Sequence, residues 1–169
     1  HFATLNGAAI YPLSRLEISL AQRYYPPDYQ ANYGKGFAEG SRIENEQGIY
    51  LSTRFEPAKR LTLSAYVDSY RFPWALYASP TPSSGQEMCA QANVKMTRRS
   101  DLTLKYKYKE KSEEETRKRT LRGTLNTQIR RWRIQTIAEG NRSDKEGQSP
   151  TYGWIVSQTH TGEIRPLHL

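Results

Sequence analysis

The side chains best placed to do chemistry are lysines that alternate with aromatic residues. Lys105, Lys107 and Lys109 are separated by Tyr106 and Tyr108. Residues two apart on an extended strand point to the same side, so the three ammonium groups form one row. Such a row attracts anions, including the phosphates of single-stranded nucleic acid. Neighbouring predicted strands carry further cations on the same polar phase, and the full set expected to face this side is Lys95, Lys105, Lys107, Lys109, Arg122, Arg130 and Arg133.

Acidic residues are interspersed among these cations. We place Glu17, Asp68, Glu110 and Glu139 on the same polar side. The acids and the cations could pair into a closed network that seals an interior. They could instead line an open path for anions or nucleic acid, or share no interior at all. The formal net charge of +8 is compatible with an anionic partner but does not decide among these interpretations.

Motifs for catalysis and for metal binding are not found in the sequence. It contains no nucleophile elbow, phosphate loop, paired-histidine motif or dinucleotide fingerprint. One cysteine and three scattered histidines do not have the spacing of a zinc site, and we expect Cys89 to be an inert thiol on the polar side. We therefore predict no enzyme activity, no cofactor and no metal. The remaining catalytic alternative is an esterase in which a serine, His160 and an acid meet only in space.

Three predicted loop segments contain charged groups or glycine. Residues 34–36 read Gly-Lys-Gly without a following helix pattern, so plain turn chemistry is expected rather than phosphate binding. Acidic residues 113–115 oppose basic residues 117–119 at a predicted solvated hairpin tip, where bridging by divalent cations or lipopolysaccharide is the alternative. The segment 42–46, which contains Arg42, Glu44 and Glu46, is our candidate for a folded lid or plug.

The elements that position these side chains alternate strictly between apolar and polar residues. This period of two is typical of β-strands with two different faces. The predicted strands span residues 2–11, 16–25, 48–56, 61–72, 87–97, 102–111, 120–130, 132–142 and 152–160. One face of these strands is apolar, and the residues expected on it are Leu16, Ile18, Leu20, Leu61, Leu63, Leu102, Leu104 and Tyr106.

Strand length and loop length together favour a membrane protein. Strands of about ten residues match the ~9–11 needed to cross a bilayer at a tilt. Short turns alternate with long loops along the chain, as they do in outer-membrane barrels. No apolar run approaches the ~20 residues of a spanning helix, and the many aromatic residues argue against disorder. We therefore predict an all-β, antiparallel up-and-down meander that forms a transmembrane β-barrel or part of a larger one, with its apolar face against lipid.

Aromatic residues at strand ends are expected to form an interfacial girdle. They are Tyr24, Tyr25, Tyr70, Phe72 and Trp74, all of which lie near predicted long loops. Girdles of this kind mark the two membrane surfaces of outer-membrane barrels. In a soluble sheet, the alternative, the same residues would cap the strands.

A family resemblance points the same way. Residues 22–50, 57–60 (PAKR) and 63–74 (LSAYVDSYRFPW) resemble the C-terminal barrel region of Bacteroidota envelope proteins that carry an N-terminal helix-hairpin-helix domain. The similarity is strongest from about residue 16 to residue 111. It implies a location in the bacterial outer membrane and little about activity. No helix-hairpin-helix segment is present here, so the DNA-binding role of such a module is not carried over to any residue.

These observations lead to two functional hypotheses. The first is a single β-barrel region over residues 1–169, expected to be a fragment of a longer barrel because nine strands are counted and single-chain bacterial barrels use even numbers. It would act in envelope transport, uptake or scaffolding without catalysis. Its partners would be outer-membrane lipid, lipopolysaccharide and other envelope proteins, with nucleic acid or other anions as cargo. The second hypothesis is a soluble antiparallel β module that binds an anionic polymer through the face at residues 105–109.

Overall fold

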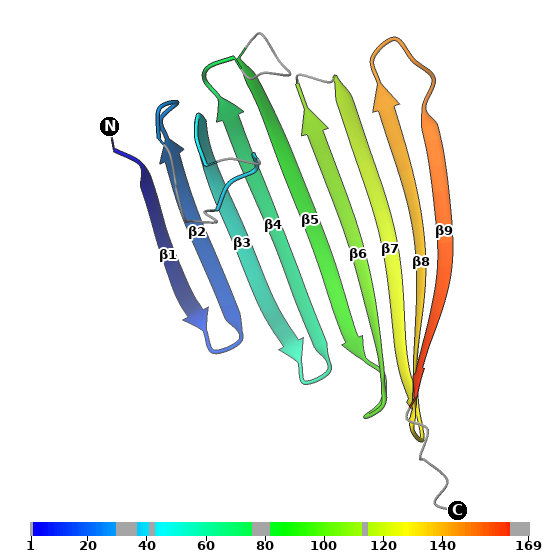
Figure 1. The fold of residues 1–169 in the computed structure, drawn as a ribbon. Helices are drawn as coiled ribbons and strands as arrows, with labels where there is room; N and C mark the ends of the chain where they lie inside the picture. The colour runs from blue at the N-terminus through cyan, green and yellow to red at the C-terminus, as the bar shows by residue number, and fades with distance from the viewer. Residues whose placement is uncertain (1, 30–36, 41–42, 76–81, 113–114, 163–169) are drawn as a thin grey trace, which may run out of the picture.

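The structure is a single antiparallel β-sheet. A computed structural model describes residues 2–29, 37–40, 43–75, 82–112 and 115–162 (Figure 1). Nine strands follow one another across the sheet in chain order, and the described residues contain no helix. The strands are β1 (Thr4–Leu13), β2 (Leu16–Tyr25), β3 (Glu46–Ala58), β4 (Leu61–Phe72), β5 (Ser83–Lys95), β6 (Ser100–Lys111), β7 (Thr116–Ile129), β8 (Trp132–Lys145) and β9 (Thr151–Gly162).

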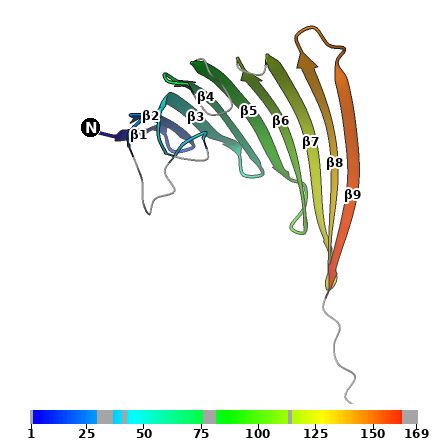
Figure 2. The same ribbon diagram turned by 45° about the horizontal axis from the view of Figure 1, so that its top comes forward.

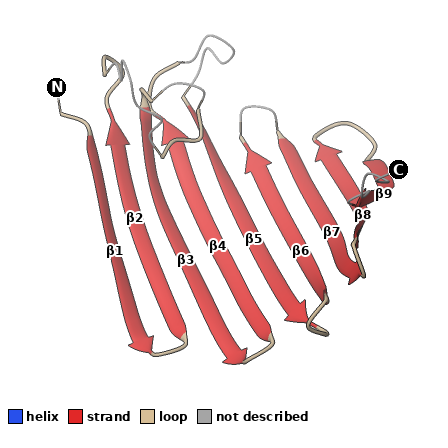
Figure 3. Cartoon of the chain, turned by 60° about the horizontal axis from the view of Figure 1, so that its bottom comes forward, coloured by secondary structure: helices blue, strands red, loops and turns tan. Residues whose placement is uncertain are grey.

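The predicted up-and-down meander is confirmed. Each strand pairs antiparallel with the next, and within the described residues β1 and β9 each pair with one neighbour. Tight turns join β1 to β2, β3 to β4, β5 to β6 and β7 to β8 at one end, and the other connections lie at the opposite end (Figure 3). We call these the turn end and the loop end of the sheet.

Two strands have the predicted bounds and the others are longer or displaced. β2 and β4 begin and end where the alternation predicts. β7 begins at Thr116 instead of residue 120, and β8 continues to Lys145 instead of residue 142. The charged residues there were assigned to loops because of their polarity, but cross-strand pairing such as Arg117 with Asp144 keeps them in the sheet.

In the middle of the sheet the register places mostly apolar side chains on one face and mostly polar side chains on the other, with Ile155 on the polar face as an exception. One cross-strand row on the first face runs from β2 to β9 through Leu16, Phe55, Leu63, Ala92, Leu104, Gly123, Ala138 and Val156. The adjacent row on the other face runs through Glu17, Arg54, Ser64, Gln91, Lys105, Arg122, Glu139 and Ile155. We call these surfaces the apolar face and the polar face. All eight residues predicted for the apolar side lie on it.

Burial follows the polar face and not the apolar one. The sheet is curved (Figure 2), and Phe37 and Glu39, two described residues before β3, contact side chains of the polar face. The buried residues include Arg23, Glu46, Asp68 and Glu87, which are on the polar face. By contrast, Leu104 on the apolar face is 48% exposed. Among the described residues, the apolar face is covered by no other element, which is the opposite of a soluble β-sandwich.

Candidate functional site

A cluster of charged residues lies on the polar face at the loop end of the sheet. Arg23 on β2 is its centre and is 1% exposed. Its Nη1 and Nη2 atoms donate to the two carboxylate oxygens of Asp68 on β4, at 2.8 and 3.1 Å. Its Nε donates to Oε1 of Glu46 on β3, at 2.5 Å. The planar guanidinium therefore binds two carboxylates on two other strands, a geometry that lysine cannot reproduce.

The carboxylate of Glu46 ties a loop segment to this cluster. Glu46 is fully buried. Besides Arg23, it accepts hydrogen bonds from the backbone N–H of Glu39, at 3.0 and 2.9 Å, and from that of Gly40, at 3.1 Å. These N–H donors satisfy the carboxylate oxygens of Glu46 that Arg23 alone does not. Residues 39 and 40 are thus held on the polar face and not in solvent.

A second set of ion pairs connects the same loop segment to β5 and β6. The Glu39 carboxylate pairs with Lys109, a residue 70 positions later in the chain. Lys109 also lies 3.3 Å from Oε2 of Glu87. The Oε1 atom of Glu87 accepts from Lys107 at 2.8 Å and from the Tyr66 hydroxyl at 2.5 Å. The ion pairs therefore extend from β2 to β6, and we call the whole set, with Arg23, Glu46 and Asp68, the buried network.

Phe37, a described residue of the same loop, is held by aromatic contacts. Phe37 packs against Tyr50 with ring centroids 5.1 Å apart, and the Arg23 guanidinium carbon lies 4.8 Å from the Phe37 ring. The Tyr25 hydroxyl donates to the Phe37 carbonyl at 3.0 Å. These contacts, together with the Glu39 ion pair, fix residues 37–40 over the polar face.

Two glycines provide space for buried side chains on the polar face. A Cβ atom on Gly48 would lie 2.5 Å from Cζ of Arg23, closer than atoms can approach. A Cβ atom on Gly85 would lie 2.5 Å from the hydroxyl oxygen of Tyr70. Both glycines are inside strands, where glycine often marks a close approach by another group. Here the approaching groups are the cluster centre and a buried tyrosine on β4.

The network is nearly balanced in charge. Three cations, Arg23, Lys107 and Lys109, face four carboxylates from Glu39, Glu46, Asp68 and Glu87. Because these cations are already paired with carboxylates, this part of the polar face has no excess positive charge with which to bind an anion. This arrangement favours, for the loop end, the sealing interpretation of the sequence.

The predicted lid or plug segment is placed only in part. Arg42 lies outside the described residues, and Glu46 is the first residue of β3 rather than a loop residue. The residues that pack on the polar face are 37–40, just before the predicted segment. Sequence reasoning missed Arg23 and Glu39, although Arg23 shares the alternation phase of Glu17 and was therefore identifiable as a polar-face cation.

The predicted cations of the polar face fall into three groups. Lys107 and Lys109 belong to the buried network, and Arg122 pairs with Glu139 on β8. Lys105, Lys95 and Arg133 lie on the polar face without an ion pair in the part of the chain that the structure describes. Arg130 was placed wrongly: β7 ends at Ile129, and Arg130 occupies the turn with a φ of 55°.

Of the four predicted acids, one is on the wrong side. Asp68 and Glu139 pair with Arg23 and Arg122, and Glu17 accepts a hydrogen bond from Ser19 at 3.3 Å. Glu110 shares a face with Leu104 and Tyr108 and pairs there with Arg117 at 3.0 Å. The prediction ignored the phase of β6, in which even-numbered residues from 102 onward point to the apolar face.

The expected aromatic girdle is also wrong for most of its members. Tyr25, Tyr70 and Phe72 lie on the polar face, where Tyr25 is 5% and Tyr70 is 4% exposed. Tyr24 lies on the apolar face, and Trp74 is beyond the end of β4. Consecutive residues of a strand point to opposite faces, so Tyr24 and Tyr25 cannot belong to one girdle.

A hollow lies on the polar face at the turn end, away from the buried network. It has a volume of about 740 Å³ and is bounded by β5, β6, β7 and β8. Its charged lining residues are Lys95, Arg98, Arg99, Asp101 and Arg133. Four cations against one carboxylate leave three uncompensated positive charges. We call this cavity the basic hollow.

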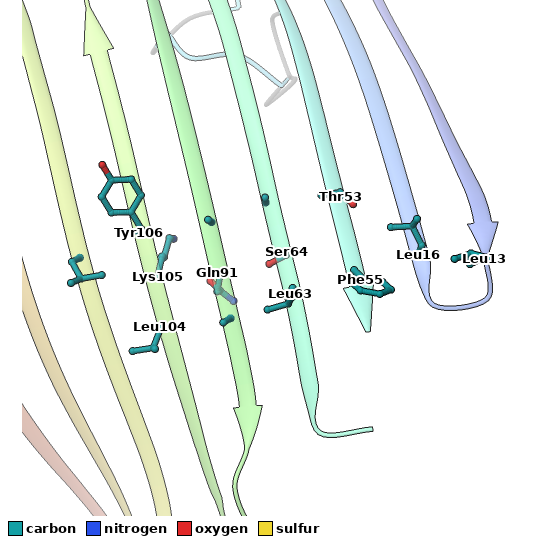
Figure 4. Close-up of a pocket in the computed structure, with 14 residues that line it drawn as sticks. Leu13, Leu16, Thr53, Phe55, Leu63, Ser64, Gln91, Leu104, Lys105 and Tyr106 are labelled. Carbon is teal, nitrogen blue, oxygen red and sulfur yellow. The ribbon is translucent and has the colours of Figure 1, made fainter. Parts of the chain in front are cut away.

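The apolar face also has a depression, which differs from the basic hollow in chemistry. Its volume is about 710 Å³, and Figure 4 shows Leu16, Phe55, Leu63, Leu104 and Tyr106 along it. Several strands contribute one or two of these side chains each. The depression is a broad, shallow part of the exposed apolar surface, and its one charged lining residue, Lys105, belongs to the polar face by register.

Groups for catalysis do not come together in the described residues. Cys89 is buried on the polar face, between Tyr66 and Lys107 in the register. His160 on β9 lies opposite Ile134, on the apolar side, with no side-chain hydrogen bond among the described residues. No group of three or more potential metal ligands is found in the described part of the chain. The esterase alternative therefore gains no support from this geometry.

Comparisons with known proteins identify no relative. No protein-family model, curated protein or solved structure matches this chain. Among the described residues, no helix is long and apolar enough to cross a membrane.

Proposed function

We propose that this chain is part of an outer-membrane β-barrel whose apolar face contacts lipid and whose polar face lines the interior. It acts in envelope transport, uptake or scaffolding and carries out no catalysis. Its partners are outer-membrane lipid, lipopolysaccharide and other envelope proteins. The family resemblance of residues 22–50, 57–60 and 63–74 to Bacteroidota envelope proteins is a separate argument for the same location.

The observation that carries this proposal is the inverted chemistry of the two faces. The row from Leu16 to Val156 is apolar across eight strands and contains no buried residue, whereas the opposite face buries Arg23 and Glu46. Soluble proteins rarely leave so large an apolar surface uncovered. A bilayer covers this surface without a second protein layer, and the lipid-facing alternation of outer-membrane barrels has the same sense.

Strand length supports the same proposal. The strands contain 10–14 residues, which at ~3.3 Å per residue corresponds to ~33–46 Å. A tilt of about 40° reduces the height to ~25–35 Å, which matches the ~25 Å apolar band of outer-membrane barrels. Strands of soluble sheets are usually about half as long.

The buried network suggests how the interior is used. Residues 37–40 lie across the polar face, held by Glu46 and by the ion pair between Glu39 and Lys109. A barrel with such an inward-folded segment conducts only if that segment moves. Scaffolding or gated uptake therefore fits better than an open pore.

The soluble anion-binding module is the weaker candidate. It relies on Lys105, Lys107 and Lys109 as a free basic row. Two of these lysines already pair with Glu87 and Glu39, which leaves Lys105 as the single cation of the row without an ion pair among the described residues. The charge available for a polymer on this row is therefore small.

Fractionation tests the proposal. The full-length protein is expressed in a Gram-negative host, and its membranes are washed with carbonate. We expect the protein to remain with the outer membrane and to migrate differently on a gel before and after heating. Complete recovery in the soluble lysate without detergent would refute the membrane location.

A further inference from the structure

We propose that the basic hollow is a binding site for a water-soluble, multiply charged phosphate anion. This inference concerns the turn end of the polar face and does not depend on whether the apolar face contacts lipid. It assigns a ligand class to side chains that the buried network leaves unused.

The cations of the basic hollow are available for a ligand. Lys95, Arg98, Arg99 and Arg133 line it, and in the described part of the chain none of their side chains forms an ion pair. Unpaired cations gathered around one cavity repel one another, so an anion that binds there relieves this repulsion. Arginine is well suited to the task because its planar guanidinium binds phosphate oxygens in pairs.

The single acid in the hollow is occupied by amides. Asp101 accepts a hydrogen bond from the side-chain amide of Asn126 at 2.9 Å. The Asn126 carbonyl oxygen in turn accepts from the Gln135 amide at 3.0 Å. Asp101 lies directly opposite Lys95 in the register, yet no ion pair between the two is present in the described part of the sheet. The amide chain therefore satisfies one oxygen of the carboxylate without using up any of the four cations.

The surroundings increase the positive potential at this end. Each of the four turns contains at least one cation, and no turn residue is acidic. These turn cations are Arg15, Lys59, Arg60, Arg98, Arg99, Arg130 and Arg131. A set of like charges around a concave surface raises the local concentration of anions and their rate of capture.

Size and position point to a small soluble ligand. The volume of about 740 Å³ lies within the ~300–1,000 Å³ typical of small-molecule sites. The hollow opens on the polar face, whereas the exposed leucines are on the other side of the sheet. A lipid whose acyl chains follow the apolar face cannot place its headgroup there, which favours a free phosphate compound over a membrane lipid.

Titration calorimetry on the full-length protein in a neutral detergent tests this site. The probes are inorganic pyrophosphate and tripolyphosphate, measured at low and at physiological salt. We expect both to bind, tripolyphosphate more tightly, and both affinities to fall as salt rises. Each of the substitutions Arg99→Gln and Arg133→Gln should weaken pyrophosphate binding by ~10-fold or more, the effect of losing a charge-assisted hydrogen bond.

The matched control is Arg117→Gln, which removes the same charge from the apolar face at the loop end. It should leave pyrophosphate affinity unchanged. Far-ultraviolet circular dichroism checks that each variant folds, and Lys95→Gln replaces any arginine variant that does not. The proposal is overturned if pyrophosphate does not bind, if the control weakens binding as much as Arg133→Gln, or if only phosphatidylglycerol in nanodiscs binds.

Discussion

Removing the guanidinium of Arg23 is the most informative single perturbation of this sheet. Arg23→Ala deletes three hydrogen bonds to carboxylates and leaves Glu46 and Asp68 as uncompensated charges. Glu46 is 0% and Asp68 is 9% exposed, so in the folded protein both carboxylates are solvated by protein groups and not by bulk water. Breaking a buried ion pair by removing one partner costs ~3–5 kcal/mol. Total stabilities are ~5–15 kcal/mol, so this variant should lose a large part of its stability.

Urea unfolding in lipid vesicles measures this effect, with folded protein followed by heat-modifiable gel migration. The matched control is Arg54→Ala, which removes an arginine from an exposed pair with Glu56, where the side chains are 59% and 45% exposed. Exposed pairs contribute ~0–1 kcal/mol, so the control should unfold near the wild-type urea concentration. Equal destabilisation by the two substitutions would refute the assignment of the network as buried.

A triple variant distinguishes two causes of destabilisation in Arg23→Ala: the loss of the contacts that Arg23 makes, and the burial of carboxylates without a compensating cation. The combined change Arg23→Met, Glu46→Gln and Asp68→Asn removes the cation together with the charges it compensates. Because the penalty arises mainly from the uncompensated carboxylates, the triple variant should be more stable than Arg23→Ala. If the triple variant is less stable than Arg23→Ala, the contacts of Arg23, including its cation–π contact with Phe37, contribute more than the uncompensated carboxylates cost.

Three other substitutions test separate parts of the structure. Gly48→Ala should lower the urea midpoint by an amount approaching that of Arg23→Ala, because its Cβ would displace the guanidinium from its carboxylates; a wild-type midpoint would contradict the close approach. Leu104→Arg should block membrane assembly at a cost of ~2–4 kcal/mol, whereas Lys105→Leu should assemble nearly normally; equal tolerance in a vesicle-insertion assay would contradict the assigned faces. Glu39→Gln weakens the tie between the loop and β6, so protease cleavage near residue 39 should become faster while the urea midpoint changes little; unchanged cleavage would show that the Glu46 contacts suffice.

The alternation of residue types was enough to predict the sheet. Side chains of an extended strand alternate between faces, so Leu102, Leu104 and Tyr106 had to share a side once the segment was a strand. The bounds of β2 and β4 and the order of the meander follow from this pattern and from the turns. Glu110 was placed on the wrong face because the alternation of β6 was not counted through to residue 110, although the alternation itself holds there.

Strand ends were harder to predict because polarity marks both loops and the ends of long strands. Residues 116–119 are polar, three of them charged, and lack the apolar alternation, yet they belong to β7 because β6 and β8 extend beside them. Backbone pairing with a neighbour outweighs local composition there. The residue types at these positions do not by themselves show that the segment belongs to the strand.

The alternation and the composition of the chain were sufficient to predict the two faces, the meander and the overall excess of positive charge. Which charges neutralise each other and which remain available depends on contacts that form in the folded sheet. Arg23 meets partners 23 and 45 residues away, and Glu39 meets Lys109 across 70 residues. These ion pairs depend on the register of successive strands and on the path of a loop. A shift of register would pair different charges without changing the alternation pattern.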